Sequence, residues 1–353
     1  MQEKIRRAGT GSQVLTLVFG MWLTAGMFME RWESSRAAAG EADRLAGGGG
    51  AELLLYSGLA ASILWLGWFM VRGKLLHGSW KSGLPDGYGA GLAGAGLFLL
   101  GSLGGLLWQL AGELQPGGIE EHYSPTRLLQ TAGAVLLVTS PFRAVWRLPG
   151  RVPGRGELWP GLLSLALGTS IAALALSSHW MLNSGSAARS GLERLGSELD
   201  PLATGLRESL YGTVIEHGLA GVLLTSALLT VPLVWSVNRW KLPFGSLFIL
   251  FTVPVLFMCI PGQSAYMAPA GIVTGLAADL LYGFLGASHR NNWKKHVLAA
   301  LVPLLLTGAF LVLEHLRAGL GWPPALWSGA MVLSALQGIV LSHLVAMNKE
   351  DSA

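Results

Sequence analysis

The sequence predicts an all-α integral membrane protein with about ten transmembrane helices. Of its 353 residues, 52% are hydrophobic and only 12% are charged, whereas a soluble protein carries about 25% charged residues. The charged residues gather in short stretches between apolar runs of about twenty residues, the length that crosses the hydrocarbon core of a bilayer. We therefore expect one polytopic membrane domain over residues 1–353, with the lipid bilayer as its first partner.

Ten apolar stretches are candidate spans, and the seventh is the shortest of them. Each must be helical, because hydrocarbon offers no water to a lipid-facing backbone N–H or C=O group. The predicted spans are 12–30, 51–71, 88–112, 125–145, 159–178, 211–235, 244–260, 264–286, 297–316 and 325–347.

The first span follows a basic start and could be mistaken for a cleaved signal peptide. A possible small-residue cleavage site, Ala37-Ala38-Ala39, lies about ten residues beyond the apolar run, after several charged residues between Glu30 and Arg36. That distance and charge are unusual for a cleavage region, so we predict an uncleaved first helix.

Lysine and arginine orient the predicted helices. With the N-terminus inside, sixteen of the 24 Lys and Arg residues fall on the cytoplasmic side, as the positive-inside rule requires. Tryptophans concentrate near both ends of the spans, as in an aromatic belt. We expect both termini in the cytoplasm, long outer loops at 31–50 and 179–210, and a location in the plasma membrane.

The loop 179–210 divides the ten spans into five and five. Because five is odd, the second half would enter the membrane from the opposite side, so a 5 + 5 inverted repeat is topologically possible. The third span of each half carries glycines one helical turn apart, at Gly101 and Gly105 and at Gly271 and Gly275, where a neighbouring helix can approach closely. With 49 glycines in the chain, chance pairing remains the alternative.

Several classes of function lack their sequence signals. The single cysteine, Cys259, excludes an intramolecular disulfide and a multi-thiolate metal centre. The chain has no nucleotide-binding P-loop, no nucleophile-elbow motif and no zincin motif. Its pI of about 9.3 reflects membrane-proximal basic residues, so we expect no nucleic-acid partner, no catalytic residue and no cofactor.

Asp279 is the clearest anomaly, because it falls about fifteen residues into the eighth span, where an aspartate costs about 2.5 to 3.5 kcal/mol. Gln337, at a similar depth in the tenth span, and Thr274 are its candidate partners. Asp279 is either a relay group for protons or cations, or a hydrogen-bonded group that holds two helices together. We favour the second interpretation, because no other acidic residue shares its depth.

A Glu-His dipeptide occurs three times on the predicted outer side, at a depth similar to that of His179. Imidazole and carboxylate groups together can bind Zn or Cu, or pass protons. Adjacent residues on a helix point in different directions, so the alternative is that these are helix-end residues solvated among lipid headgroups. The weak metal candidates are Glu121, His122, Glu216, His217, Glu314 and His315.

Stretches across most of the chain resemble an uncharacterised bacterial family of multi-pass membrane proteins. They include Ser124-Pro125-Thr126-Arg127, Pro141-Phe142-Arg143 and Gly275-Leu276-Ala277-Ala278-Asp279. The family's first helix ends in D-x-W-A-H-x-H, its third carries D-x-x-W-H, and its fourth opens with S-P-T-H-L. The resemblance implies a bacterial plasma membrane protein.

This chain departs from that family at the histidines. It reads Glu30-Arg31-Trp32-Glu33-Ser34-Ser35-Arg36 at the first motif, has Gly105 and Gln109 at the second, and has Arg127 at the S-P-T-H histidine. Glycine has no side-chain ligand, and arginine stays protonated and repels a cation. If the family's histidines form a metal site, this chain is a divergent, non-catalytic member.

Three functions remain open at this point. The leading hypothesis is a non-enzymatic plasma-membrane protein that acts as an accessory or interaction component, with other membrane subunits as partners. The alternatives are a secondary transporter of a small solute or cation that uses Asp279, and an outer-face metal-binding protein or enzyme that uses the Glu and His residues.

Overall fold

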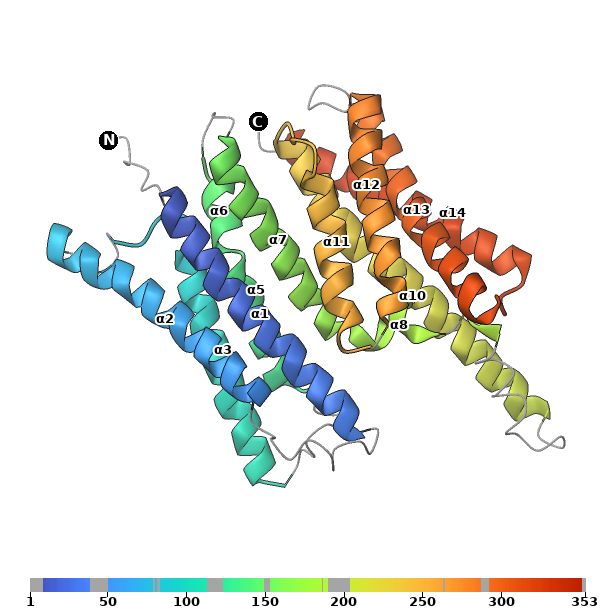
Figure 1. The fold of residues 1–353 in the computed structure, drawn as a ribbon, viewed down its shortest axis with the longest axis horizontal. Coiled ribbons are helices and arrows are strands. Elements are labelled where there is room, and N and C mark those ends of the chain that lie inside the picture. Colours follow the sequence, from blue (N-terminus) through green and yellow to red (C-terminus); the bar gives the residue numbers. More distant parts are fainter. Residues whose placement is uncertain are drawn as a thin grey trace. The chain divides into compact units, whose positions relative to one another are not determined.

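The described residues of the chain form mostly helices (Figure 1). The computed structural model describes residues 9–38, 50–78, 80, 83–112, 123–148, 153–185, 187–189, 204–262, 264–286 and 292–350. Within these ranges the β-type pairing is a single isolated bridge between Ala188 and Leu320, so the predicted all-α class is confirmed. The chain divides into two compact units, Met1–Ala175 and Leu176–Ala353, which we call unit 1 and unit 2. A single membrane domain over the whole chain stays a prediction.

Unit 1 is built around its last helix. Its elements are α1 (Thr10–Ala38), α2 (Gly50–His77), α3 (Gly89–Leu110), α5 (Pro125–Val138), α6 (Ser140–Trp146) and α7 (Arg155–Ala175). Helix α7 packs against α1, α5 and α6, while α2 packs on α1 and α3 packs on α5. Small residues such as Ser164, Gly168 and Ser170 line α7, and all three are buried. Small side chains let its neighbours approach from several directions.

Glycines set the close helix crossings of unit 1. Where α3 crosses α5, a Cβ added to Gly94 would lie 2.5 Å from the carbonyl oxygen of Gly133, and the reverse substitution would meet the Gly94 oxygen at 2.5 Å. Where α1 crosses α2, a Cβ on Gly58 would lie 2.8 Å from the backbone nitrogen of Leu23. These crossings bring backbone against backbone, which side chains larger than hydrogen would prevent.

The predicted fourth span is broken into α5 and α6, which meet at an angle of 50°. Pro141 lies in the first turn of α6 and lacks the N–H that would continue the hydrogen-bond ladder of α5. The Arg143 guanidinium occupies the break: it donates to Thr139 Oγ1 at 2.9 Å, to the Gly87 carbonyl at 3.1 Å and to the Leu136 carbonyl. A cation therefore satisfies the C-terminal end of α5, where the helix dipole is negative.

Unit 2 contains five longer helices and a short segment that packs against them. The helices are α8 (Met181–Ser184), α10 (Thr204–Arg239), α11 (Ser246–Cys259), α12 (Ala268–Leu285), α13 (Asn292–Ala318) and α14 (Pro324–Glu350), with 3₁₀ turns η3 (Ser177–His179) and η4 (Ala265–Met267). Helix α13 packs on α10, α12 and α14, and α11 packs on α12. Gly275 permits the last contact, because a Cβ there would lie 2.9 Å from the Phe248 Cα.

Eight described helices are long and apolar enough to cross a membrane, and the bent pair α5 and α6 makes a ninth if it forms one span. The seventh predicted span, 244–260, coincides with α11, whose 14 residues rise only about 21 Å along the axis. That is short of a hydrocarbon core of about 30 Å. The structure thus supports a multi-pass membrane protein, while the count of ten spans and the orientation of the termini stay predictions.

The two units share part of a packing pattern. In each, the first helix packs on the fourth and fifth, and the fourth packs on the third and fifth, taking α5 and α6 together as the fourth helix of unit 1. The second helix differs, since α2 packs mainly on α1 whereas α11 packs mainly on α12. The shared pairings are those expected of a 5 + 5 repeat, which itself stays a prediction.

We predict that Gly133→Val destabilises the protein by about 1–3 kcal/mol relative to Gly96→Val, because the added side chain is forced into the α3–α5 crossing. Gly96 lies on α3, and no described residue comes within 4 Å of the Cβ position there, so it is the matched control. Thermal unfolding midpoints of the two detergent-solubilised variants test this. Equal midpoints would show that the crossing is not close.

Candidate functional site

Asp279 binds the start of a neighbouring helix. Its side chain on α12 is only 2% exposed. The carboxylate accepts hydrogen bonds from the backbone N–H groups of Gly245 at 3.0 Å, Phe248 at 2.8 Å and Leu247 at 3.2 Å. These groups belong to the first turn of α11, where a helix has no internal acceptors for its N–H groups. Asp279 therefore caps α11 from outside that helix.

The local sequence explains why α11 needs an external cap. Gly245 precedes the helix in the left-handed region, at φ 93°, and has no side chain to accept a hydrogen bond. Asp279 supplies the missing acceptor, and its negative charge lies at the positive end of the helix dipole. Gly275, one turn earlier on α12, allows the close approach that brings the carboxylate into reach. This geometry supports the interpretation of Asp279 as a group that holds two helices together.

The two candidate partners of Asp279 lie elsewhere. Gln337 Oε1 accepts a hydrogen bond from Ser226 Oγ at 2.7 Å, which ties α14 to α10. Thr274 Oγ1 is buried without a hydrogen-bond partner in the described part of the chain. Neither residue supplies a hydrogen bond to Asp279, because the backbone of α11 has taken that role.

Among the residues that the structure describes, the Glu-His pairs are not gathered into one site. Glu121 and His122 lie outside the described residues, and Glu216 and His217 are exposed on α10. Across the described ranges, no group of three or more His, Cys, Asp or Glu side chains is placed to hold a metal ion. His217 instead lies beside His179 of η3, with ring centroids 4.5 Å apart.

The third pair divides between the core and the surface. His315 is exposed, whereas Glu314 is 0% exposed on α13. Both carboxylate oxygens of Glu314 lack a hydrogen-bond partner among the described groups. Glu314 is therefore not a solvated helix-end residue. Its burial could have been read from the sequence, because it continues the three- and four-residue spacing of the buried residues Thr307, Phe310 and Leu311.

One basic and one aromatic side chain, those of Arg317 and Tyr266, lie near Glu314. The Arg317 guanidinium lies one turn further along α13 and stacks 3.9 Å from the centroid of the Tyr266 ring. Tyr266 lies two residues after Ser264, whose hydroxyl donates to Asn183 Oδ1. Asn183 Nδ2 in turn donates to the Met258 carbonyl at 3.2 Å. Glu314, Arg317 and Tyr266 thus lie at one end of unit 2. Of the three, Glu314 is the one whose carboxylate oxygens accept no hydrogen bond from a described residue.

In unit 1, residues from two of the resembling motifs meet. Arg127 of α5 forms an ion pair of 2.8 Å with Glu30 of α1, and both side chains are 20% exposed. Arg127 also donates to Gln130 Oε1 at 3.0 Å, and Gln130 Nε2 donates to Ser102 Oγ on α3 at 3.1 Å. An ion pair and an amide thus link three helices at the place where the resemblance implies aspartate and histidine.

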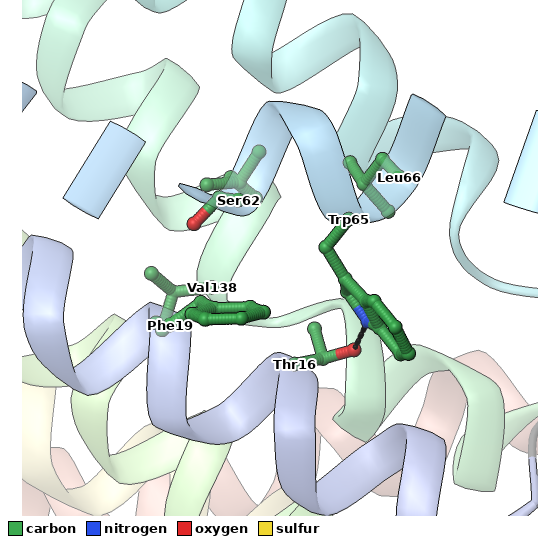
Figure 2. Close-up of a pocket in the computed structure, with 8 residues that line it drawn as sticks. Thr16, Phe19, Ser62, Trp65, Leu66 and Val138 are labelled. Carbon is green, nitrogen blue, oxygen red and sulfur yellow. Dashed lines mark hydrogen bonds between the residues drawn. The ribbon is translucent and has the colours of Figure 1, made fainter. Parts of the chain in front are cut away.

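A small pocket also lies in unit 1, between α1, α2 and α5 (Figure 2). Figure 2 shows the Trp65 indole pointing down to Thr16, to which its Nε1 donates at 2.9 Å. The hydroxyls of Thr16 and Ser62 donate to carbonyls of their own helices. The remaining lining is apolar, including Phe19 and Val138, so the pocket offers no group for acid–base or metal chemistry.

The chain matches no protein-family model, no curated protein and no solved structure.

We predict that Asp279→Ala lowers the free energy of unfolding by about 2 kcal/mol, because it leaves three N–H groups at the start of α11 without this acceptor. Thr274→Val is the matched control. Thr274 lies between one and two turns before Asp279 on the same helix, and its hydroxyl has no hydrogen-bond partner among the described residues. Denaturant unfolding in detergent compares the two variants with the unsubstituted protein. An Asp279→Ala variant as stable as Thr274→Val would show that the cap contributes nothing.

Proposed function

We propose that this chain is a non-enzymatic multi-pass membrane protein that works as an accessory or interaction component of a larger membrane assembly. The observation that carries the proposal is the position of Asp279. From the sequence, Asp279 is the strongest candidate for a transport residue. Its carboxylate instead accepts hydrogen bonds from three backbone N–H groups at the start of α11, which is a structural role.

Three charged side chains of unit 1 are used in the same way. Arg143 is bound to backbone and hydroxyl oxygens around the break between α5 and α6. Glu30 and Arg127 are bound to each other across two helices. Groups that would have to change partners during transport or catalysis are here fixed between helices, and this supports a framework role.

The proposal predicts a membrane partner present in constant proportion to this chain. Cross-linking in intact membranes, followed by purification in mild detergent, should recover that partner at the same ratio at low and high salt. A ratio that falls on washing would indicate non-specific capture. A single uncomplexed species that carries a measurable solute flux after reconstitution would contradict the proposal.

A second candidate, a secondary transporter of a small cation, is favoured by one observation. Glu314 is fully buried and both of its carboxylate oxygens are without a hydrogen-bond partner among the described residues. Buried polar groups that lack partners are rare in native proteins and call for an explanation. Cation binding from the predicted outer side would supply one, and the helix pairings common to the two units are those a transporter repeat would have.

We predict that, if the chain transports cations, Glu314→Gln abolishes the flux while Asp279→Asn retains it, because the carboxylate of Asp279 is filled by three N–H groups and that of Glu314 has no hydrogen-bond partner among the described residues. Proton and Na⁺ entry into vesicles that contain the purified protein, driven by an imposed membrane potential, measures this. If Asp279→Asn lost the flux and Glu314→Gln kept it, Asp279 would be the residue required for cation transport. No flux through the folded, unsubstituted protein would remove the transporter candidate.

A further inference from the structure

Two histidines from distant parts of unit 2 lie side by side. His179 ends the 3₁₀ turn η3 and His217 lies in the first half of α10, and their ring centroids are 4.5 Å apart. His217 is exposed and His179 is half-buried, so the described part of the chain does not cover the pair. Two imidazoles whose nitrogens both lie 2.0–2.1 Å from one metal ion place their ring centroids about 4.5 Å apart at the right angle of a tetragonal Cu²⁺ site, and about 5 Å apart at the tetrahedral angle of a Zn²⁺ site. The observed spacing is within that range.

Ser178 orients both rings. His217 Nε2 lies 2.8 Å from the Ser178 carbonyl oxygen, and since a carbonyl can only accept, Nε2 carries the proton. The neutral ring of His217 then keeps a lone pair on Nδ1. His179 Nδ1 lies 2.9 Å from Ser178 Oγ, and donation to that oxygen leaves the lone pair of His179 on Nε2. Metal-binding histidines are oriented in this way, by donating their second ring N–H to an oxygen.

The packing around η3 fixes the pair in place. A Cβ on Gly221 would lie 2.7 Å from the His179 carbonyl oxygen, so the glycine lets η3 lie directly against α10. The residues that follow are anchored: Trp180 and Met181 are 1% and 0% exposed, and the Met181 N–H donates to Thr225 Oγ1 on α10 at 3.1 Å. Because both histidines are attached to one rigid region, little ordering remains to be done when a ligand binds.

We propose that His179 and His217 bind one divalent transition-metal ion, Zn²⁺ or Cu²⁺, at the surface of unit 2, with Ser178 as the residue that positions both ligands. Imidazole nitrogen suits these two ions, and Mg²⁺ and Ca²⁺ require oxygen ligands instead. Water completes the coordination, as in metal sites that keep open positions. The site therefore exchanges its ion with the solution and is distinct from a closed structural zinc centre.

The test is metal binding by the full chain in detergent, with any affinity tag removed. Isothermal titration with ZnCl₂ and with CuSO₄ should show one equivalent bound, and MgCl₂ should show none. His179→Ala and His217→Ala should each weaken binding by more than about tenfold, and Ser178→Ala should weaken it less, because the carbonyl that orients His217 remains. His315→Ala, which removes an exposed histidine of the same unit, is the matched control and should bind as the unsubstituted chain does.

Two further readings keep the test decisive. Circular dichroism of each variant checks that the helices are retained, and Zn²⁺ should raise the thermal midpoint of the unsubstituted chain but not that of His217→Ala. Absence of Zn²⁺ and Cu²⁺ binding, or equal binding by His217→Ala and His315→Ala, would overturn the proposal. Equal heats for Zn²⁺ and Mg²⁺ would also overturn it, because they would indicate binding by carboxylates or headgroups.

Discussion

The hydrogen bonds between Asp279 and the start of α11 satisfy the constraint on which a membrane bundle depends, since buried backbone polar groups have no water to bind. Helix α11 begins at a left-handed glycine that cannot cap it, and a carboxylate from α12 takes that place. In unit 1 the end of a helix needs donors instead of acceptors, and a positive charge supplies them. Arg143 donates to the Leu136 carbonyl of α5, where Pro141 interrupts the predicted fourth span. An acid at a helix start and a base at a helix end are the two placements that the helix dipole favours.

Close packing by glycine makes both arrangements possible. Gly275 brings α12 against α11, and Gly87, at φ 96°, offers its carbonyl to Arg143 while its own backbone approaches Ala144. Lipid is as apolar as leucine, so helices in a membrane gain little from burying apolar side chains and associate through close contact and hydrogen bonds. Short contacts and charged caps therefore act together in each unit, and a function that moves these charges would have to break the contacts.

Apolar length and the obligation to be helical in a membrane were sufficient to predict an all-α class from the sequence. The predicted spans 12–30 and 325–347, for example, lie inside α1 and α14. The break at Pro141 was missed, although proline within an apolar run was its signal. The sequence showed Asp279 to be anomalous but did not show its partners. These are backbone N–H groups, which every residue except proline has, so residue types do not reveal them. His179 and His217 are 38 positions apart in the chain, and only the packing of η3 on α10 brings them together.

The central claim is that Asp279 is committed to the first turn of α11, and hydrogen exchange at the Gly245, Leu247 and Phe248 amides tests it most directly. In the unsubstituted protein in detergent, we expect these three amides to exchange as slowly as those in the middle of α11, because each is held by the Asp279 carboxylate. Exchange as fast as at an uncapped helix start would contradict the account and leave Asp279 available for another role.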